Sequence, residues 1–274
     1  MERKILVPID YTKVSENAVD HAQNLALHIG AEVYLLHLVS RAEHLSDAKT
    51  RMQAFKEHMS SRYEGVKFLS TVRVGSIFDD ISDVAAELEV VLIVMGTHGM
   101  RGFQFLVGSN ALRIVSSSRT PFIIVQEKGI KENGYDDIVV PLDLHKETKQ
   151  KLSLVVNMAK YFNARVHLIS PHETDEFLQN TLKRNLAFAS QKMKEAGIEH
   201  KVVVADKDKD FDDAIISYSV VHDIDLISIM NLKENSLAGL LGGGYTQKVV
   251  TNEAQIAVML INPAQTGHID IFGV

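Results

Sequence analysis

The segment from Met95 to Asn110, MGTHGMRGFQFLVGSN, has the composition of a phosphate-binding loop. Its glycines would let backbone N–H groups approach phosphate oxygens closely. Four of its polar side chains could add hydrogen bonds: His98, Arg101, Ser109 and Asn110. An arginine can pair with a phosphate through two hydrogen bonds, and a helix N-terminus adds partial positive charge. Because the segment leaves a predicted strand and enters a predicted helix, it predicts an anion site at a sheet edge.

An acidic side chain is expected at the same edge. Residues 5–10 read ILVPID, an apolar run that ends in Pro8, Ile9 and Asp10. Open α/β sheets bind ligands outside the carboxyl ends of their strands, so Asp10 could accept hydrogen bonds from ribose hydroxyls or a base. The glycine segment matches neither G-x-G-x-x-G nor the P-loop, and alone it fits a turn with an N-cap equally well. The strand-end aspartate favours the nucleotide interpretation.

This strand-end motif occurs twice. Residues 138–143 read IVVPLD, so Pro141 and Asp143 repeat Pro8 and Asp10 about one domain length later. The repeat predicts two similar domains, at 1–127 and 135–263, followed by a tail at 264–274. As in a duplicated homodimer, we expect the domains to form an intramolecular pseudo-dimer with contacts at 122–125 and 256–261, and a homodimer is a further expectation.

Hydrophobic patterning predicts an α/β fold in both halves. Short apolar runs are typical of parallel strands buried on both faces, and helical spacing fills the intervals. The predicted strands lie at 5–8, 33–39, 66–74, 91–95 and 122–125, and at 138–142, 166–170, 202–205, 226–230 and 256–261. Ser15 is the expected N-cap of the first helix, with Gly30 and Asn163 ending the first helix of each half. One helix is predicted at 146–162. Each half should therefore be a doubly wound, Rossmann-like domain with a five-stranded parallel sheet.

Composition excludes several classes of function. The chain has 274 residues, 46% of them apolar, with a net charge of −6 and no cysteine. The charge gives no footprint for nucleic acid or an anionic membrane, and the lack of cysteine excludes disulfides and thiolate metal sites. No leader or membrane-spanning run is evident, so a cytoplasmic protein is expected.

The chain resembles the universal stress protein family. The resemblance rests on ILVPID, HIGAEVYLLHLV, VRVGSIFDDI, GTHG…GSNA and TPFIIV. It covers the first half and continues more weakly over the second, as in a tandem-domain member. It implies two adenine nucleotide alpha hydrolase-like domains and binding of ATP, or of ADP or AMP, alone or with Mg²⁺. The adenosine pocket would be formed by Pro8, Ile9, Asp10, Leu38 and Met95. The phosphates would lie at Gly96, His98, Gly99, Gly108, Ser109 and Asn110.

Two departures from the family pattern matter. The eight residues 100–107 separate Gly99 from Gly108, one fewer than the family has, which affects the γ-phosphate end more than the adenosine end. In the second half, Asn231 and Glu234 stand where the first has glycines, and Gly243 and Gly244 follow. We therefore expect one nucleotide per chain, held by the first half.

Other polar residues carry weaker signals. The twelve histidines include no H-E-x-x-H spacing, so no metal site is predicted, and His98 is the one expected near a ligand. The carboxylates at 206–213 are expected to be solvated or to suit a helix dipole. No nucleophile with a base is evident, so catalysis beyond slow ATP hydrolysis is not expected. The favoured function is ATP binding in the stress response. The alternative is a scaffold or small-ligand sensor without the phosphate clamp, and a nucleotide-using enzyme ranks last.

Overall fold

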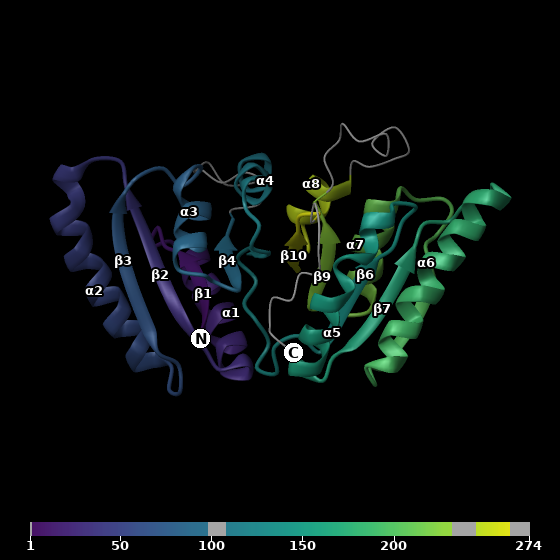
Figure 1. Ribbon diagram of the computed structural model, residues 1–274, viewed down its shortest axis with the longest axis horizontal. Helices are drawn as coiled ribbons and strands as arrows, with labels where there is room; N and C mark the ends of the chain where they lie inside the picture. The colour runs from purple at the N-terminus through teal and green to yellow at the C-terminus, as the bar shows by residue number, and fades with distance from the viewer. Residues whose placement is uncertain (1, 98–107, 232–244, 264–274) are drawn as a thin grey trace. The chain divides into compact units, whose positions relative to one another are not determined.

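The computed structural model describes residues 2–97, 108–231 and 245–263. The chain divides into two compact units, Met1–Ile130 and Lys131–Val274 (Figure 1). No described helix combines the length and the apolar character needed to cross a bilayer.

The described part of the first unit contains five parallel strands. They are β1 (Arg3–Pro8), β2 (Ala31–Val39), β3 (Phe68–Val74), β4 (Leu92–Gly96) and β5 (Phe122–Val125). Their order in the sheet is β3-β2-β1-β4-β5, and each neighbouring pair is parallel. The order reverses between β1 and β4, the place where open α/β sheets bind ligands.

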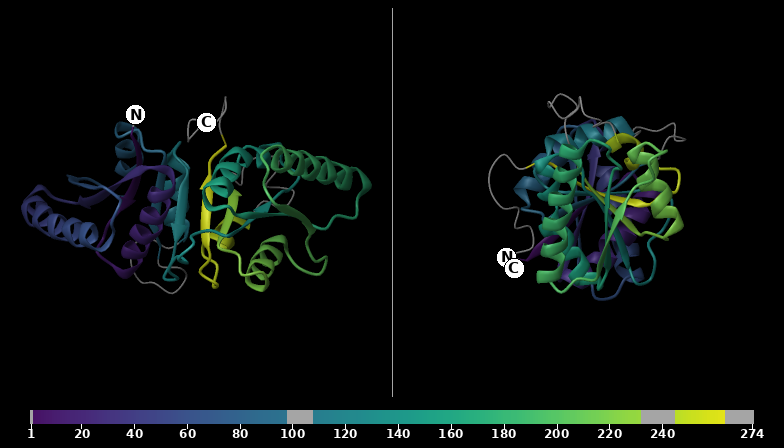
Figure 2. Two further views of the ribbon diagram at one scale, coloured as in Figure 1. Left: turned by 90° about the horizontal axis from the view of Figure 1, so that it is seen from below. Right: turned by 90° about the vertical axis from the view of Figure 1, so that its right-hand side faces the viewer.

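Helices cover both faces of this sheet (Figure 2). They are α1 (Lys13–Ile29), α2 (Leu45–Arg62), α3 (Asp80–Glu87) and α4 (Gly108–Ser117), with the short 3-10 helix η1 (Ala42–His44) before α2. Right-handed crossovers place α1 and α2 on one face and α3 and α4 on the other. The core between them is formed by fully buried strand residues such as Ile5, Val33 and Leu92.

The second unit repeats this topology. Its described strands are β6 (Asp137–Pro141), β7 (Arg165–Ser170), β8 (His200–Val204), β9 (Leu226–Met230) and β10 (Ala257–Ile261). They are parallel, in the order β8-β7-β6-β9-β10. Its helices are η2 (Lys146–Lys149), α5 (Leu152–Phe162), α6 (Glu176–Glu195), α7 (Phe211–Val221) and α8 (Tyr245–Val250). The predicted α/β fold with parallel sheets is confirmed.

Helix ends show where local prediction worked and where it was wrong. Gly30 ends α1 with φ 64°, and Asn163 ends α5 with φ 51°, both in the left-handed region as predicted. The predicted N-cap Ser15 is wrong. Thr12 caps α1, and its Oγ1 accepts a hydrogen bond from the Ser15 N–H at 3.3 Å. Ser15 lies in the first turn, where its hydroxyl donates to the Thr12 carbonyl at 2.9 Å.

The single helix predicted at 146–162 is confirmed only from Leu152 to Phe162. The chain first forms η2 and then α5, which begins at Leu152. Lys151 lies between the two helices. This lysine is fully buried, and its ammonium group donates to the Pro141 carbonyl at 2.6 Å. A lysine side chain that points into the unit in this way marks the break between the two helices.

Candidate functional site

The carboxyl end of β1 places Asp10 at the point where the strand order reverses. The ladder continues one residue past the strand, since the Ile9 N–H donates to the Leu36 carbonyl at 2.7 Å. Ile9 is buried, whereas Asp10 is exposed. Because β1 stays paired with β2 as far as Ile9, the next residue, Asp10, lies at the surface of this sheet edge.

Asp10 also shapes the turn that leads into α1. Its Oδ1 accepts hydrogen bonds from the Thr12 N–H at 3.0 Å and the Thr12 hydroxyl at 2.6 Å. An aspartate that accepts from the backbone two residues later stabilises a turn. Tyr11 lies between them with φ 65°, a conformation that costs a side-chain-bearing residue about 1–3 kcal/mol and occurs often at functional sites.

An aromatic and cationic cluster beside Asp10 was missed by the sequence reasoning. The Tyr11 ring lies 4.8 Å from the His37 ring, 5.6 Å from the Phe55 ring and 3.9 Å from the Arg51 guanidinium carbon. Burial raises the pKa of Tyr11, which Arg51 partly opposes. His37 donates from Nδ1 to the Ile9 carbonyl at 2.7 Å. The position of Tyr11 directly after the Pro-x-Asp motif was the available signal.

Gly96 at the end of β4 is required by packing. A Cβ atom there would lie 2.7 Å from both Cγ1 and the carbonyl oxygen of Val14, in the first turn of α1. These distances are shorter than real side chains allow, so the glycine lets β4 approach α1. The glycine pattern predicts a phosphate-binding role for Gly96, and its packing against Val14 is an independent reason for a glycine here.

The other predicted site residues divide between described and undescribed parts of the chain. Leu38 is half-buried in β2, and Met95 is buried in β4. Gly108 begins α4, with Ser109 and Asn110 in its first turn, and only the backbone of these three is described. His98, Gly99 and Arg101 lie outside the described residues. The structure thus brings the ends of β1 and β4 together, with a helix starting at Gly108.

The corresponding edge of the second unit is built differently. Asp143 is buried, unlike Asp10, and its Oδ1 accepts from the His145 N–H at 2.9 Å. The Asn185 side chain, from α6, donates to the Asp143 carbonyl at 2.8 Å. The same Pro-x-Asp motif therefore ends in an enclosed carboxylate here.

Lys151 lies near enough to this enclosed carboxylate to feel its charge. Its Nζ donates to the Pro141 carbonyl and to Thr148 Oγ1, at 2.6 and 3.1 Å. Burial lowers the pKa of Lys151 to about 8, and the negative charge of Asp143 opposes that shift. The second unit thus supplies its own cation close to the aspartate that would face a ligand.

The end of β9 differs from the end of β4 as well. Asn231 occupies the position of Gly96, and its side chain is buried and donates to Asn262 Oδ1 at 2.7 Å. An amide pair therefore occupies this edge where the first unit has a glycine. Glu234, Gly243 and Gly244 lie outside the described residues.

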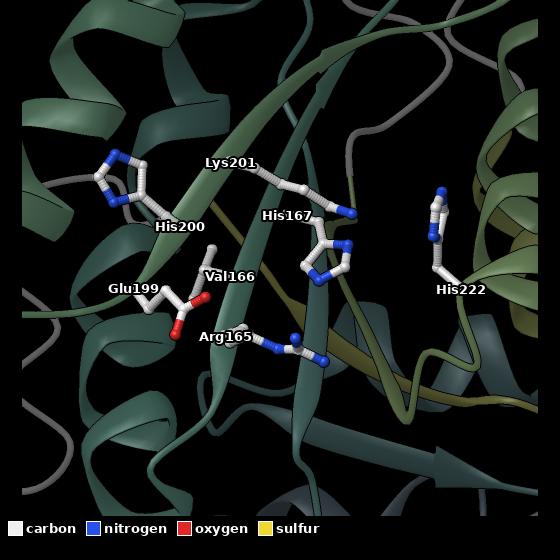
Figure 3. A pocket seen from close by; sticks show the side chains of 7 residues that line it. All are labelled: Arg165, Val166, His167, Glu199, His200, Lys201 and His222. Carbon is white, nitrogen blue, oxygen red and sulfur yellow. The ribbon is translucent and has the colours of Figure 1, made fainter.

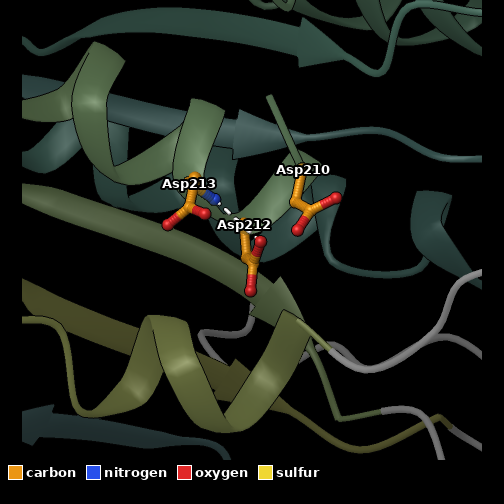
Figure 4. A group of neighbouring side chains, drawn as sticks. All are labelled: Asp210, Asp212 and Asp213. Carbon is orange, nitrogen blue, oxygen red and sulfur yellow. Dashed lines mark hydrogen bonds between the residues drawn. The ribbon is translucent and has the colours of Figure 1, made fainter. Parts of the chain in front are cut away.

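One acidic cluster has atoms close enough to hold a cation. Among the described residues, only Asp210, Asp212 and Asp213 form such a group, with ligand atoms within 4.8 Å of one another (Figure 4). Lys248 from α8 lies 3.5 Å from Asp212 and 2.6 Å from Asp213. The ammonium group offsets one of the three negative charges and links α7 to α8 through ion pairs with Asp212 and Asp213.

Comparison with known proteins adds to this geometry. The model of the universal stress protein family matches residues 1–126. "Universal stress protein MJ0531" of Methanocaldococcus jannaschii is 30% identical over 140 residues, which cover 46% of this chain and 82% of that protein. The chain belongs to the universal stress protein family. "Universal stress protein G" of Salmonella typhimurium is 28% identical over 145 residues, 46% of this chain and all of that protein.

A solved structure shares the fold over nearly the whole chain. The universal stress protein from Archaeoglobus fulgidus superposes with a TM-score of 0.73 at 14% identity, covering 96% of this chain and 97% of that one. The likeness extends over both units, whereas the family model and these two sequence relatives match about half of the chain.

Proposed function

We propose that this protein is a cytoplasmic, ATP-binding regulatory member of the universal stress protein family, with the nucleotide held by the first unit. The observation that carries the proposal is the meeting of three features at one edge: the exposed Asp10, the end of β4 and the start of α4 at Gly108. A carboxylate suits ribose or base, and a helix N-terminus suits phosphate.

The second unit is proposed to be a tandem copy that binds no nucleotide. Its strand-end aspartate is enclosed, Asn185 covers the adjacent carbonyl and Lys151 supplies an internal cation. Together with the loss of glycines at Asn231 and Glu234, these contacts support one nucleotide per chain.

Calorimetry with ATP, with and without Mg²⁺, tests both statements. We expect one site per chain, and at least about a tenfold loss of affinity, or 1.4 kcal/mol, in Gly108→Val, because the side chain blocks backbone approach to phosphate. Gly129→Val is the matched control, since a Cβ atom there meets nothing within 4 Å. Two sites per chain would contradict the asymmetry. No binding at millimolar ATP would favour the alternative of a scaffold or sensor without a phosphate clamp.

A further inference from the structure

A hollow of about 200 Å³ lies at the amino-terminal ends of β7 and β8 in the second unit (Figure 3). Four of the lining side chains carry nitrogen atoms and share one face, as shown below: Arg165, His167, Lys201 and His222. It is at the opposite end of the strands from Asp143, and the proposed nucleotide site does not use it. The volume is enough for several water molecules or a small ligand.

Strand register brings these side chains to one face. Residues two apart on a strand point to the same side, so Arg165 and His167 share a face of β7. His167 is paired with Lys201 of β8, which therefore points to that face too. Tyr218 and His222, at the end of α7, cover it: the Tyr218 hydroxyl lies 3.0 Å from His167 Nδ1, and the rings of Tyr218 and His222 are 4.1 Å apart.

The buried carboxylate of Asp137 holds two of the lining side chains, Arg165 and His167, in place. Asp137 accepts hydrogen bonds from Arg165 Nε at 3.0 Å, Arg165 Nη2 at 2.8 Å and His167 Nε2 at 2.8 Å. With a proton on Nε2, neutral His167 accepts the Tyr218 hydroxyl at Nδ1. His167 is therefore held in a fixed orientation at the side of the hollow. The Arg165 side chain is 57% exposed and can still donate from Nη1 to a ligand.

Lys201 is the least neutralised cation of the hollow, because Arg165 is paired with Asp137 and also lies in the field of Glu199 and Asp136. The Lys201 ammonium lies 5.5 Å from the Tyr218 ring centre, and no carboxylate of a described residue lies within ion-pair distance of it. Burial is the largest cause that lowers the pKa of His167, and the charges of Lys201 and His222 lower it further, against Asp137. Glu199 is the exposed acid at the rim.

The first unit shows that the fold does not need this cluster. The β1–β2 pairing of Lys4 with Glu32 corresponds to the β6–β7 pairing of Asp137 with Arg165, with the signs of charge reversed. Two residues further along β2, Tyr34 stands where the second unit has His167. Glu32 forms its ion pair with Lys67, so the charges there are paired within the unit.

We propose that the hollow of the second unit binds a phosphate group, either as inorganic phosphate or as a small phosphate monoester. Arg165 and Lys201 would provide the permanent cations, since arginine and lysine are the usual phosphate partners. The His222 ring would add a third N–H donor. Glu199 and the carbonyls at the end of α7 oppose an anion, so removing the Glu199 charge should tighten binding.

Titration of the intact protein with phosphate, followed by NMR of its ¹⁵N-labelled histidine rings, tests the proposal. We expect saturable shifts of the His222 ring with inorganic phosphate, and a similar titration with glycerol 3-phosphate shows whether esters are accepted. Lys201→Met should weaken binding at least about tenfold. Lys207→Met, which removes an exposed lysine of the same unit away from the hollow, should not change it.

Two further variants separate this site from the glycine loop of the first unit. Glu199→Gln should tighten binding by removing the rim charge. Gly108→Val should leave the His222 titration unchanged. The proposal is overturned if the His222 ring does not respond to millimolar phosphate, or if folded Lys201→Met binds as tightly as the wild type.

Discussion

Replacing Lys151 with methionine should change stability in opposite directions at neutral and at high pH. The wild-type ammonium group is fully buried, and burial lowers its pKa from 10.5 to about 8. At 1.36 kcal/mol per pKa unit, holding the charged form inside costs the folded state about 3 kcal/mol at pH 7. Methionine has a similar length and carries no charge, so this cost disappears.

The hydrogen bonds of Lys151 offset part of that gain. Its bonds to the Pro141 carbonyl and Thr148 Oγ1 are each worth about 1 kcal/mol. The Pro141 carbonyl keeps one donor, because Thr148 Oγ1 lies 3.3 Å from it. At pH 7 we therefore expect Lys151→Met to be about 1 kcal/mol more stable than the wild type.

The pH dependence follows from proton linkage. Between about 8 and 10.5 the unfolded chain holds the lysine proton while the folded chain has released it, so the unfolded state binds more protons. The free energy of unfolding of the wild type therefore rises with pH across this window. By pH 10 about 1 kcal/mol of the desolvation cost remains against about 2 kcal/mol of hydrogen bonds, so Lys151→Met should be about 1 kcal/mol less stable than the wild type.

Urea unfolding at pH 7 and pH 10 measures this change of about 2 kcal/mol between variant and wild type. Hydrogen exchange of peptides from β6 and β7, monitored by mass spectrometry, assigns the effect to the second unit. Lys160→Met, at an exposed position on α5, is the control and should show no such dependence. A difference between Lys151→Met and wild type that is equal at both pH values would refute the reasoning.

Three other substitutions test single contacts. Burial lowers the pKa of His21 to about 4, although a hydrogen bond to the Lys128 backbone raises it. The wild type should therefore lose stability as pH falls from about 6.5 towards 4. His21→Gln should reduce that loss, which urea unfolding at pH 7 and pH 5 measures. Gly96→Ala should cost about 1–3 kcal/mol in the same assay at pH 7, because its Cβ would press on Val14. Asn163→Ala should lower the unfolding free energy by about 1 kcal/mol, since φ is 51°, and an unchanged midpoint would contradict the left-handed helix end.

Most of the fold could be predicted from the sequence because its signals are local. Continuous apolar runs located the strands, and Gly30 and Asn163 marked helix ends whose φ values are indeed positive. The N-cap was placed at Ser15 when Thr12 is used. Both residues can cap a helix, and the choice is made by Asp10, which holds Thr12 in the turn through two hydrogen bonds.

The candidate site was harder to predict because its details depend on contacts distant in sequence. Tyr11 meets Arg51 and Phe55 only when α2 packs beside the end of β1. Gly96 is constrained by Val14, more than 80 residues earlier in the chain. A glycine motif read along one segment cannot distinguish such packing from a ligand's need for backbone approach.

The two Pro-x-Asp motifs show how far a motif alone can carry a functional argument. Asp10 and Asp143 follow equivalent strands, yet one is exposed and the other enclosed. The difference comes from the residues that follow: α1 begins three residues after Asp10, whereas η2 and the buried Lys151 separate Asp143 from α5. Asp143 is buried and its Oδ1 already accepts a hydrogen bond from His145, so it has little surface left to offer a ribose or a base. One nucleotide per chain is therefore the stoichiometry that the packing around Asp143 favours, independently of the lost glycines.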